Sequence, residues 1–154
     1  MKKLVVLILF CIPLPLFAQG FDYKDIEIAM TVKGGELAVG QKGEIVVTFT
    51  IPFGYSLTTN DQYPEIKLMN DVPGLKLGKL VKSDPHYEDA TGGHWEFEAT
   101  STLPFYFSRD VEPAEYEAVF GFVMQACEKN GMCYFPSAAE DVKKKITIKL
   151  VKKK

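Results

Sequence analysis

The chain has 154 residues, of which 47% are hydrophobic and 25% charged, and its formal net charge at pH 7 is −2. This length suits one domain that buries about two-thirds of its unfolded surface. Because acidic residues outnumber basic ones, 20 to 18, the composition argues against nucleic acid as a partner.

The N-terminus has the pattern of an export signal. Two basic residues, an unbroken apolar run and a small residue suited to a cleavage point follow in order: Lys2-Lys3, 4–10 and Ala18. The apolar run is short for a bilayer span, and Pro13 and Pro15 interrupt its continuation. We therefore expect a signal peptide over 1–19 and a soluble, periplasmic or otherwise exported domain over 20–154. A retained N-terminal anchor is the alternative.

The rest of the chain alternates apolar and polar residues with a period of two, which is typical of half-buried β-strands. The strands that we expect, in chain order, cover 25–30, 44–51, 65–69, 75–81, 94–99, 103–107, 115–125 and 145–150. In the fifth of these, the pattern predicts Trp95 and Phe97 on the inner face and His94 at the surface. The sixth contains Pro104, which cannot donate a backbone hydrogen bond, so we expect it at a sheet edge. Seven or eight strands separated by turns predict an all-β, antiparallel two-sheet sandwich.

The cysteine count is informative. Cys11 falls within the expected signal, so the mature domain would keep Cys127 and Cys133, which an exported protein can hold as a disulfide. Five residues separate them, with a turn expected at Asn130-Gly131, so a tight loop can bring the two Cα atoms within bridging range. Closing so small a loop stabilises a fold by only about 2.4 kcal/mol in the chain-entropy model. Spacing alone favours a structural staple and leaves thiol–disulfide exchange open.

The residues around the pair carry a more specific signal. The residues that match one family's motif, without a gap, are Gln125-Ala126-Cys127, Gly131, Cys133-Tyr134 and Pro136. In this stretch the chain resembles the N-terminal periplasmic domain of the thiol:disulfide interchange protein DsbD. Phe135 stands where that family commonly has a proline, and Met124 where an aromatic residue is frequent.

The resemblance implies an immunoglobulin-like fold and a role in electron transfer. Such a domain passes reducing equivalents from a membrane thiol carrier to exported thiol proteins, in processes such as cytochrome c biogenesis. In that family the second cysteine forms the mixed disulfide, a role that falls on Cys133, and Cys127 would resolve it. No bound cofactor is implied, and the partners would be a separate membrane thiol carrier and thioredoxin-like proteins, both bound transiently. Whether the exchange amounts to an enzymatic protein-disulfide reductase activity stays open.

The resemblance also implies a cap loop, whose aromatic side chain shields the cysteine pair until a partner arrives. The polar segment 83–89 is our candidate, because of its position before the fifth expected strand. Tyr87 would be the shield, with His86 as the second choice. Asp84 or Glu88 near the pair would raise a thiol pKa and slow idle reaction. A solvated acidic loop is the alternative.

Other chemistries have weaker signals. Sulfur atoms of Met124, Met132 and the two cysteines, with His86, are of the type that binds Cu(I). Core packing is the more usual role of a methionine on an apolar strand face, and we expect no metal. No Ser/His/Asp arrangement stands out in the sequence. The competing function is a secreted binding or assembly module with a purely structural disulfide.

Overall fold

The computed structural model describes residues 21–129 and 131–153, and the expected signal peptide over 1–19 lies outside them. The described chain is almost entirely β-structure, with one short 3₁₀ helix, η1 (Tyr23–Asp25). The strands are β1 (Glu27–Val32), β2 (Glu36–Ala38), β3 (Lys42–Thr50), β4 (Tyr55–Thr59), β5 (Glu65–Leu68), β6 (Leu75–Leu77), β7 (Tyr87–Asp89), β8 (Gly92–Trp95), β9 (Glu98–Phe107), β10 (Glu115–Val123), β11 (Ala126–Glu128) and β12 (Lys143–Val151). No helix in this part of the chain has the length and apolar character needed to cross a membrane.

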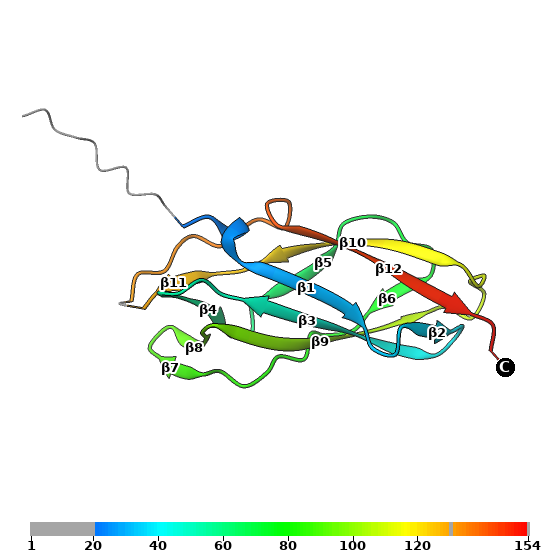
Figure 1. Cartoon of the computed structure of the whole chain (residues 1–154), viewed down its shortest axis with the longest axis horizontal. Coiled ribbons are helices and arrows are strands. Elements are labelled where there is room, and N and C mark those ends of the chain that lie inside the picture. The colour runs from blue at the N-terminus through cyan, green and yellow to red at the C-terminus, as the bar shows by residue number, and fades with distance from the viewer. Residues whose placement is uncertain (1–20, 130, 154) are drawn as a thin grey trace, which may run out of the picture.

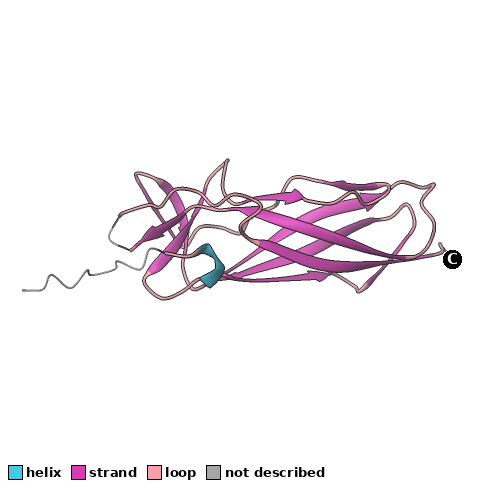
Figure 2. Cartoon of the chain, turned by 90° about the horizontal axis from the view of Figure 1, so that it is seen from above, coloured by secondary structure: helices cyan, strands magenta, loops and turns pink. Residues whose placement is uncertain are grey.

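The strands form three four-stranded sheets, ordered β1-β3-β9-β6, β2-β12-β10-β5 and β11-β4-β8-β7. Neighbouring strands are antiparallel, except that β2 runs parallel to β12. The first two sheets run along the long axis of the molecule, and the third lies at the end opposite to the C-terminus (Figures 1 and 2). The expectation of an all-β, immunoglobulin-like antiparallel sandwich is confirmed, with the β2–β12 pair as its single parallel contact among the described strands.

Alternation along the strands explains the core between the first two sheets. On β3, Ile45, Val47 and Phe49 are buried, as the period-two pattern predicts. On β10, Phe120 and Phe122 are buried in the same way. Phe122 meets Phe49 edge to face, with ring centroids 6.0 Å apart, and this contact joins the two sheets.

The expected strand over 94–99 is wrong, because β8 ends at Trp95 and β9 begins at Glu98. Between them Phe97 has a φ of 61°, a left-handed conformation that is strained for a bulky side chain, and its ring is exposed rather than buried. The expectation of a surface histidine is also wrong, because His94 is 1% exposed. Because the strand is interrupted at Phe97, β8 pairs with β4 and β7 in the third sheet instead of continuing into β9. The side chain of His94 is buried in this sheet.

The segment expected as an edge strand over 103–107 is instead the second half of β9, which lies between β3 and β6. Pro104 is tolerated in this interior strand because β6 pairs only with the three residues that follow it. The missing N–H of Pro104 therefore breaks no ladder bond, while its carbonyl accepts a hydrogen bond from Gly78 N–H at 2.7 Å. The strand expected over 75–81 is correspondingly shorter, because β6 ends at Leu77.

We expect Phe49→Ala to lower the free energy of unfolding by about 3–5 kcal/mol, because it leaves a cavity where the two sheets meet. Phe53→Ala is the matched control, since Phe53 is 84% exposed and its loss should change stability by less than about 0.5 kcal/mol. Urea denaturation followed by circular dichroism measures both variants. Equal losses of stability in the two would contradict the placement of Phe49 in the core.

Candidate thiol–disulfide site

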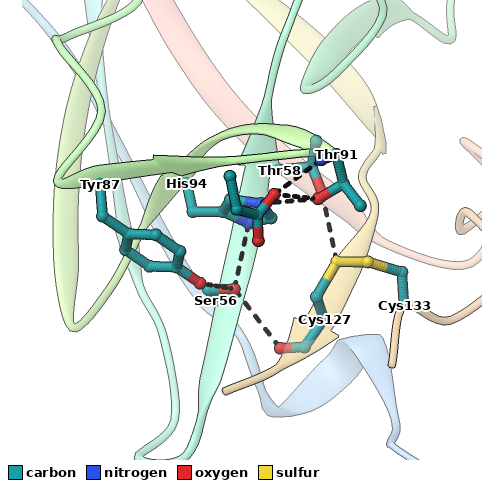
Figure 3. A network of polar contacts seen from close by, with 8 residues as sticks. Ser56, Thr58, Tyr87, Thr91, His94, Cys127 and Cys133 are labelled. Carbon is teal, nitrogen blue, oxygen red and sulfur yellow. Dashed lines mark hydrogen bonds and ion pairs between the residues drawn. A yellow bond between two sulfur atoms is a disulfide. The ribbon is translucent and has the colours of Figure 1, made fainter. Parts of the chain in front are cut away.

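Cys127 and Cys133 form a disulfide at the end of the molecule built by the third sheet (Figure 3). Cys127 lies in β11, where it pairs with Ser56 of β4, and 2% of its surface is exposed. Cys133 pairs with Cys127 through an isolated β-bridge, with the two Cα atoms 3.9 Å apart, and it remains partly exposed. The two cysteines therefore meet solvent unequally.

Backbone hydrogen bonds close the loop between the cysteines independently of the sulfur atoms. The Glu128 N–H donates to the Met132 carbonyl at 2.7 Å, and the Tyr134 N–H donates to the Ala126 carbonyl at 2.9 Å. Gly131 has a φ of 99°, a conformation that glycine adopts without strain. Because none of these bonds involves a sulfur atom, breaking the disulfide removes none of them directly.

The third sheet has one apolar and one polar face around the cysteine. Leu57, Trp95 and Ala126 pair across β4, β8 and β11 and pack into the core. Successive residues of a strand point to opposite faces, so their neighbours form the polar face. Its members are Ser56, Thr58, His94 and Cys127, joined by Tyr87 of β7. All but Tyr87 are buried, so each buried polar atom there needs a hydrogen-bond partner.

Cys127 is bonded on this face through both its sulfur and its backbone. The hydroxyl oxygen of Thr58 lies 3.4 Å from Cys127 Sγ. The Ser56 hydroxyl lies within 3.5 Å of the Cys127 carbonyl oxygen and accepts a hydrogen bond from the Tyr87 hydroxyl at 3.1 Å. Figure 3 shows that Thr58 contacts the sulfur while Ser56 contacts the carbonyl oxygen. Two residues on the same face of β4 therefore bind two different atoms of Cys127.

His94 connects this cluster to the turn between β7 and β8. Its Nδ1 lies 3.3 Å from Ser56 Oγ, and its Nε2 lies 2.9 Å from Thr91 Oγ1 and 3.1 Å from Asp89 Oδ1. Its ring stacks on Tyr87 with centroids 4.8 Å apart. A Ser/His/Asp arrangement that the sequence did not reveal is therefore present. Because Ser56 is fully buried, this arrangement fixes the β7–β8 hairpin against β4 and does not present a nucleophile to a substrate.

The carboxylate that closes this chain of contacts is stabilised in its charged form. The Thr91 hydroxyl donates to Asp89 Oδ1 at 2.6 Å, and the Thr91 N–H donates to the same oxygen at 2.7 Å. These two bonds, the hydroxyl first, lower the pKa of Asp89 to about 2, and the contact with His94 adds a smaller effect in the same direction. Asp89 is therefore ionised at neutral pH.

The residues predicted for the cap lie on and just before the β7–β8 hairpin, so part of that segment is a strand rather than a loop. Tyr87 is brought to the polar face, where its hydroxyl reaches Ser56. His86 has a different role, because its Nδ1 accepts a hydrogen bond from the Glu96 N–H at 3.0 Å. Asp84 and Glu88 have exposed side chains, and the carboxylate that enters the network is the neighbouring Asp89.

The predicted supporting residues flank the bridge. Gln125 donates from Nε2 to the Tyr134 carbonyl at 3.4 Å, while Pro136 is exposed. The Tyr134 hydroxyl donates to Glu128 Oε1 at 2.5 Å, and this hydrogen bond raises the pKa of Tyr134 to about 12. Tyr134 is therefore bonded to Gln125, which precedes the disulfide loop, and to Glu128 within it.

The first described residues, which sequence reasoning missed as part of the site, pack on the same loop. The Tyr23 hydroxyl accepts a hydrogen bond from the Ala126 N–H at 3.1 Å. The Phe21 ring lies 4.5 Å from that of Tyr55 and 5.5 Å from that of Tyr134, measured between centroids. The aromatic residues at 21 and 23, ahead of the first expected strand, were the available signal.

Large apolar side chains are exposed near the bridge, namely Phe53, Phe97, Met132 and Phe135. A hydrogen bond and an ion pair connect three of the segments that carry them. The carbonyl of Gly54, next to Phe53, accepts from the Lys129 N–H at 3.0 Å, and Lys129 Nζ lies 3.8 Å from Glu96, next to Phe97. Exposed apolar surface gathered at one place is typical of an interaction site.

The described residues do not bring a metal-binding set of His, Cys, Asp and Glu side chains together. Among residues 21–129 and 131–153, no three His, Cys, Asp or Glu side chains lie where they could hold a metal ion together. Met124, considered above as a sulfur ligand for Cu(I), is buried in the hydrophobic core.

Comparisons with known proteins give matches among solved structures. No protein-family model matches the chain, and no curated protein matches it. Among solved structures, the chain is similar to the crystal structure of the Neisseria meningitidis DsbD N-terminal domain in its reduced form. The two are 24% identical with a TM-score of 0.47, over 82% of this chain and 86% of that chain.

We expect Asp89 to titrate at a pH of about 2, well below the ordinary value of 3.8. The charged carboxylate then stabilises the hairpin at every pH above 3.8, and this stabilisation is lost as the pH falls through about 2. In Thr91→Val the larger of the two hydrogen bonds is missing, so the midpoint should move up toward 3.8.

Carbon-13 NMR of the Asp89 carboxyl carbon measures this midpoint, with Thr100→Val, an exposed threonine of β9, as the matched control. A wild-type midpoint at the ordinary value, or the same midpoint in Thr91→Val, would contradict the bonding described for Asp89.

Proposed function

We propose that this protein is an exported thiol–disulfide exchange domain that works through Cys127 and Cys133. The observation that carries the proposal is the unequal burial of the pair, because Cys127 is shielded in β11 while Cys133 is reachable at the end of its loop. Exchange requires one accessible sulfur for an incoming thiolate and one sulfur that leaves. The mature domain would be residues 20–154, acting in the periplasm or another exported compartment.

The unequal exposure of the pair supports a different role for each cysteine in the reaction. A thiolate of the electron donor attacks Cys133 Sγ, the bond to Cys127 Sγ breaks, and Cys127 leaves as a thiolate. The second thiol of the donor then attacks the mixed disulfide, so the donor becomes a disulfide and this domain carries two thiols. In the reverse steps Cys133 attacks a disulfide of the client protein, and Cys127 resolves the mixed disulfide. No cofactor takes part in these steps, because making and breaking sulfur–sulfur bonds transfers the two electrons.

The scaffold around the loop suits a bond that opens and closes repeatedly. The backbone bonds from Glu128 to Met132 and from Tyr134 to Ala126 hold both ends of the loop without the sulfur atoms. A disulfide of this spacing contributes about 2.4 kcal/mol by loop closure alone, and less where the loop is already closed. Reduction would therefore leave the two thiols close enough to reform the bond.

The surface around Cys133 suits brief docking of another protein. Met132 and Phe135 offer exposed apolar contact area next to Cys133 in the chain, and Phe53 and Phe97 are exposed beside residues that contact Lys129 of the same loop. We propose a membrane thiol carrier as donor and thioredoxin-like proteins as acceptors, each bound transiently through a small interface. The β7–β8 hairpin would act as the cap, since β7 is the outermost strand of its sheet and carries Tyr87 beside the site.

The test compares how fast each single-cysteine variant forms a mixed disulfide with glutathione when it is treated with glutathione disulfide. Mass spectrometry of the intact protein measures the adduct over time. Cys127→Ala leaves the partly exposed Cys133, so we expect a stable glutathione adduct within minutes at pH 8. Cys133→Ala leaves the buried Cys127, and we expect adduct formation at least about tenfold slower because access to its thiolate is restricted. Equal rates, or faster reaction of Cys127, would contradict the assigned roles.

The second candidate is a binding or assembly module in which the disulfide is a staple, and the deep burial of Cys127 favours it. In that case the oxidised domain resists reduction by thioredoxin in the presence of its reductase and NADPH. Both Cys→Ala variants would then lose stability but keep any partner that docks on the apolar surface. Rapid reduction of the wild-type bridge by thioredoxin would exclude this candidate.

A further inference from the structure

Thr58 is a buried threonine whose hydroxyl contacts a sulfur atom of the disulfide. It lies in β4 between β11 and β8, with its N–H donating to the Gln125 carbonyl at 2.9 Å and its Cα opposite His94. Thr58 is 1% exposed, so its hydroxyl is shielded from bulk solvent and needs a partner inside the protein. The side-chain contact available to Thr58 Oγ1 within the described residues is Cys127 Sγ, at 3.4 Å.

The direction of this hydrogen bond follows from chemistry. Cys127 Sγ is bonded to Cys133 Sγ and carries no hydrogen, so it can only accept, and the Thr58 hydroxyl donates. A disulfide sulfur is a weak acceptor, whereas a thiolate is a strong one because it carries a full negative charge. The same donor in the same place therefore binds the product of bond cleavage more strongly than it binds the disulfide.

We propose that Thr58 is a catalytic residue of the exchange, whose hydroxyl stabilises the Cys127 thiolate as it leaves Cys133. The inference rests on the proposed function, because it concerns the bond that the exchange breaks. An incoming thiolate forms a bond to Cys133 Sγ, and the electron pair of the broken sulfur–sulfur bond goes to Cys127 Sγ. The hydroxyl proton stays on Thr58, and the hydrogen bond from Thr58 Oγ1 to Cys127 Sγ shortens as negative charge develops on that sulfur. A donor already aimed at that atom needs no reorganisation when the bond breaks.

The other polar groups of the face do not take this role. Ser56 reaches the backbone carbonyl of Cys127 rather than its sulfur. The nitrogen atoms of His94 are occupied by Ser56, Thr91 and Asp89. The Asp89 carboxylate is held by Thr91 and His94 on the hairpin side. Thr58 is therefore the group that couples β4 directly to the reacting sulfur.

The rate of reduction of the wild-type bridge by dithiothreitol, compared with two Thr58 variants, tests the proposal. Thr58→Val keeps the shape and removes the donor, so the second-order rate should fall by about threefold or more, given a fractional dependence of rate on thiol pKa. Thr58→Ser keeps the hydroxyl and should retain most of the rate. Ser101→Ala, which removes a buried hydroxyl of β9 that has no partner in the described structure, is the matched control and should react like the wild type.

A second readout separates a catalytic from a merely structural role. In a Cys133→Ser background, the pKa of Cys127 can be read from the ultraviolet absorbance of its thiolate. Thr58→Val should raise that pKa by about one unit, and Thr58→Ser should restore it, because a hydrogen bond to the charged form is lost and regained. If Thr58 had only a structural role, its substitution would change stability but not the pKa of Cys127. The pKa measurement therefore remains informative even if Thr58→Val is destabilised.

The outcomes separate the role of Thr58 from the exchange function of the cysteine pair. If dithiothreitol and thioredoxin reduce the wild-type bridge, but neither the rate nor the Cys127 pKa changes in Thr58→Val, the role of Thr58 is overturned and the exchange function stands. If neither reductant opens the wild-type bridge, the exchange function itself fails, and the role of Thr58 fails with it. A slower rate together with a raised pKa, both restored in Thr58→Ser, supports the proposal.

Discussion

The register between β11 and β4 fixes the depth and surroundings of Cys127. Pairing Cys127 with Ser56 places the cysteine on the polar face of the third sheet, while Ala126 and Leu57 beside them face the core. The same register sets Thr58 within reach of the sulfur and leaves Cys133 to return at the margin of the sheet. A shift of one residue would turn Cys127 toward the core and remove each of these contacts.

A buried polar face is costly unless every group on it is bonded, and this requirement shapes the end of the molecule. Ser56 and His94 satisfy one another, and His94 in turn draws Asp89 and Thr91 from the hairpin turn onto the sheet. The hairpin is consequently held by side-chain contacts around His94 as well as by its own ladder. Chemistry at the cysteine pair and the placement of Tyr87 thus depend on one connected set of hydrogen bonds.

Period-two alternation predicted the long strands and the core positions such as Phe49 and Phe122, because those strands bury one continuous face. It failed where backbone geometry overrides pattern: the positive φ of Phe97 ends a strand that alternates well in sequence. The cysteine pair could be found from spacing and export context, but its neighbours Ser56, Thr58 and Asp89 could not. Ser56 and Thr58 lie in the short strand β4, and their contacts with Cys127 join segments that lie far apart in the chain, although their alternation about Leu57 was a usable signal. Asp89 is bonded to residues close to it in sequence, but only the turn of the β7–β8 hairpin brings it to His94.

The proposed function depends on a sulfur–sulfur bond that another protein can open, and the reduction potential of the Cys127–Cys133 bridge tests this most directly. Equilibration of the purified protein with defined ratios of reduced and oxidised glutathione, and of reduced and oxidised dithiothreitol for more negative values, followed by thiol alkylation and mass spectrometry, measures it. We expect a value in the range of known exchange proteins, roughly −270 to −120 mV. A value below about −300 mV, typical of structural disulfides, would contradict the account.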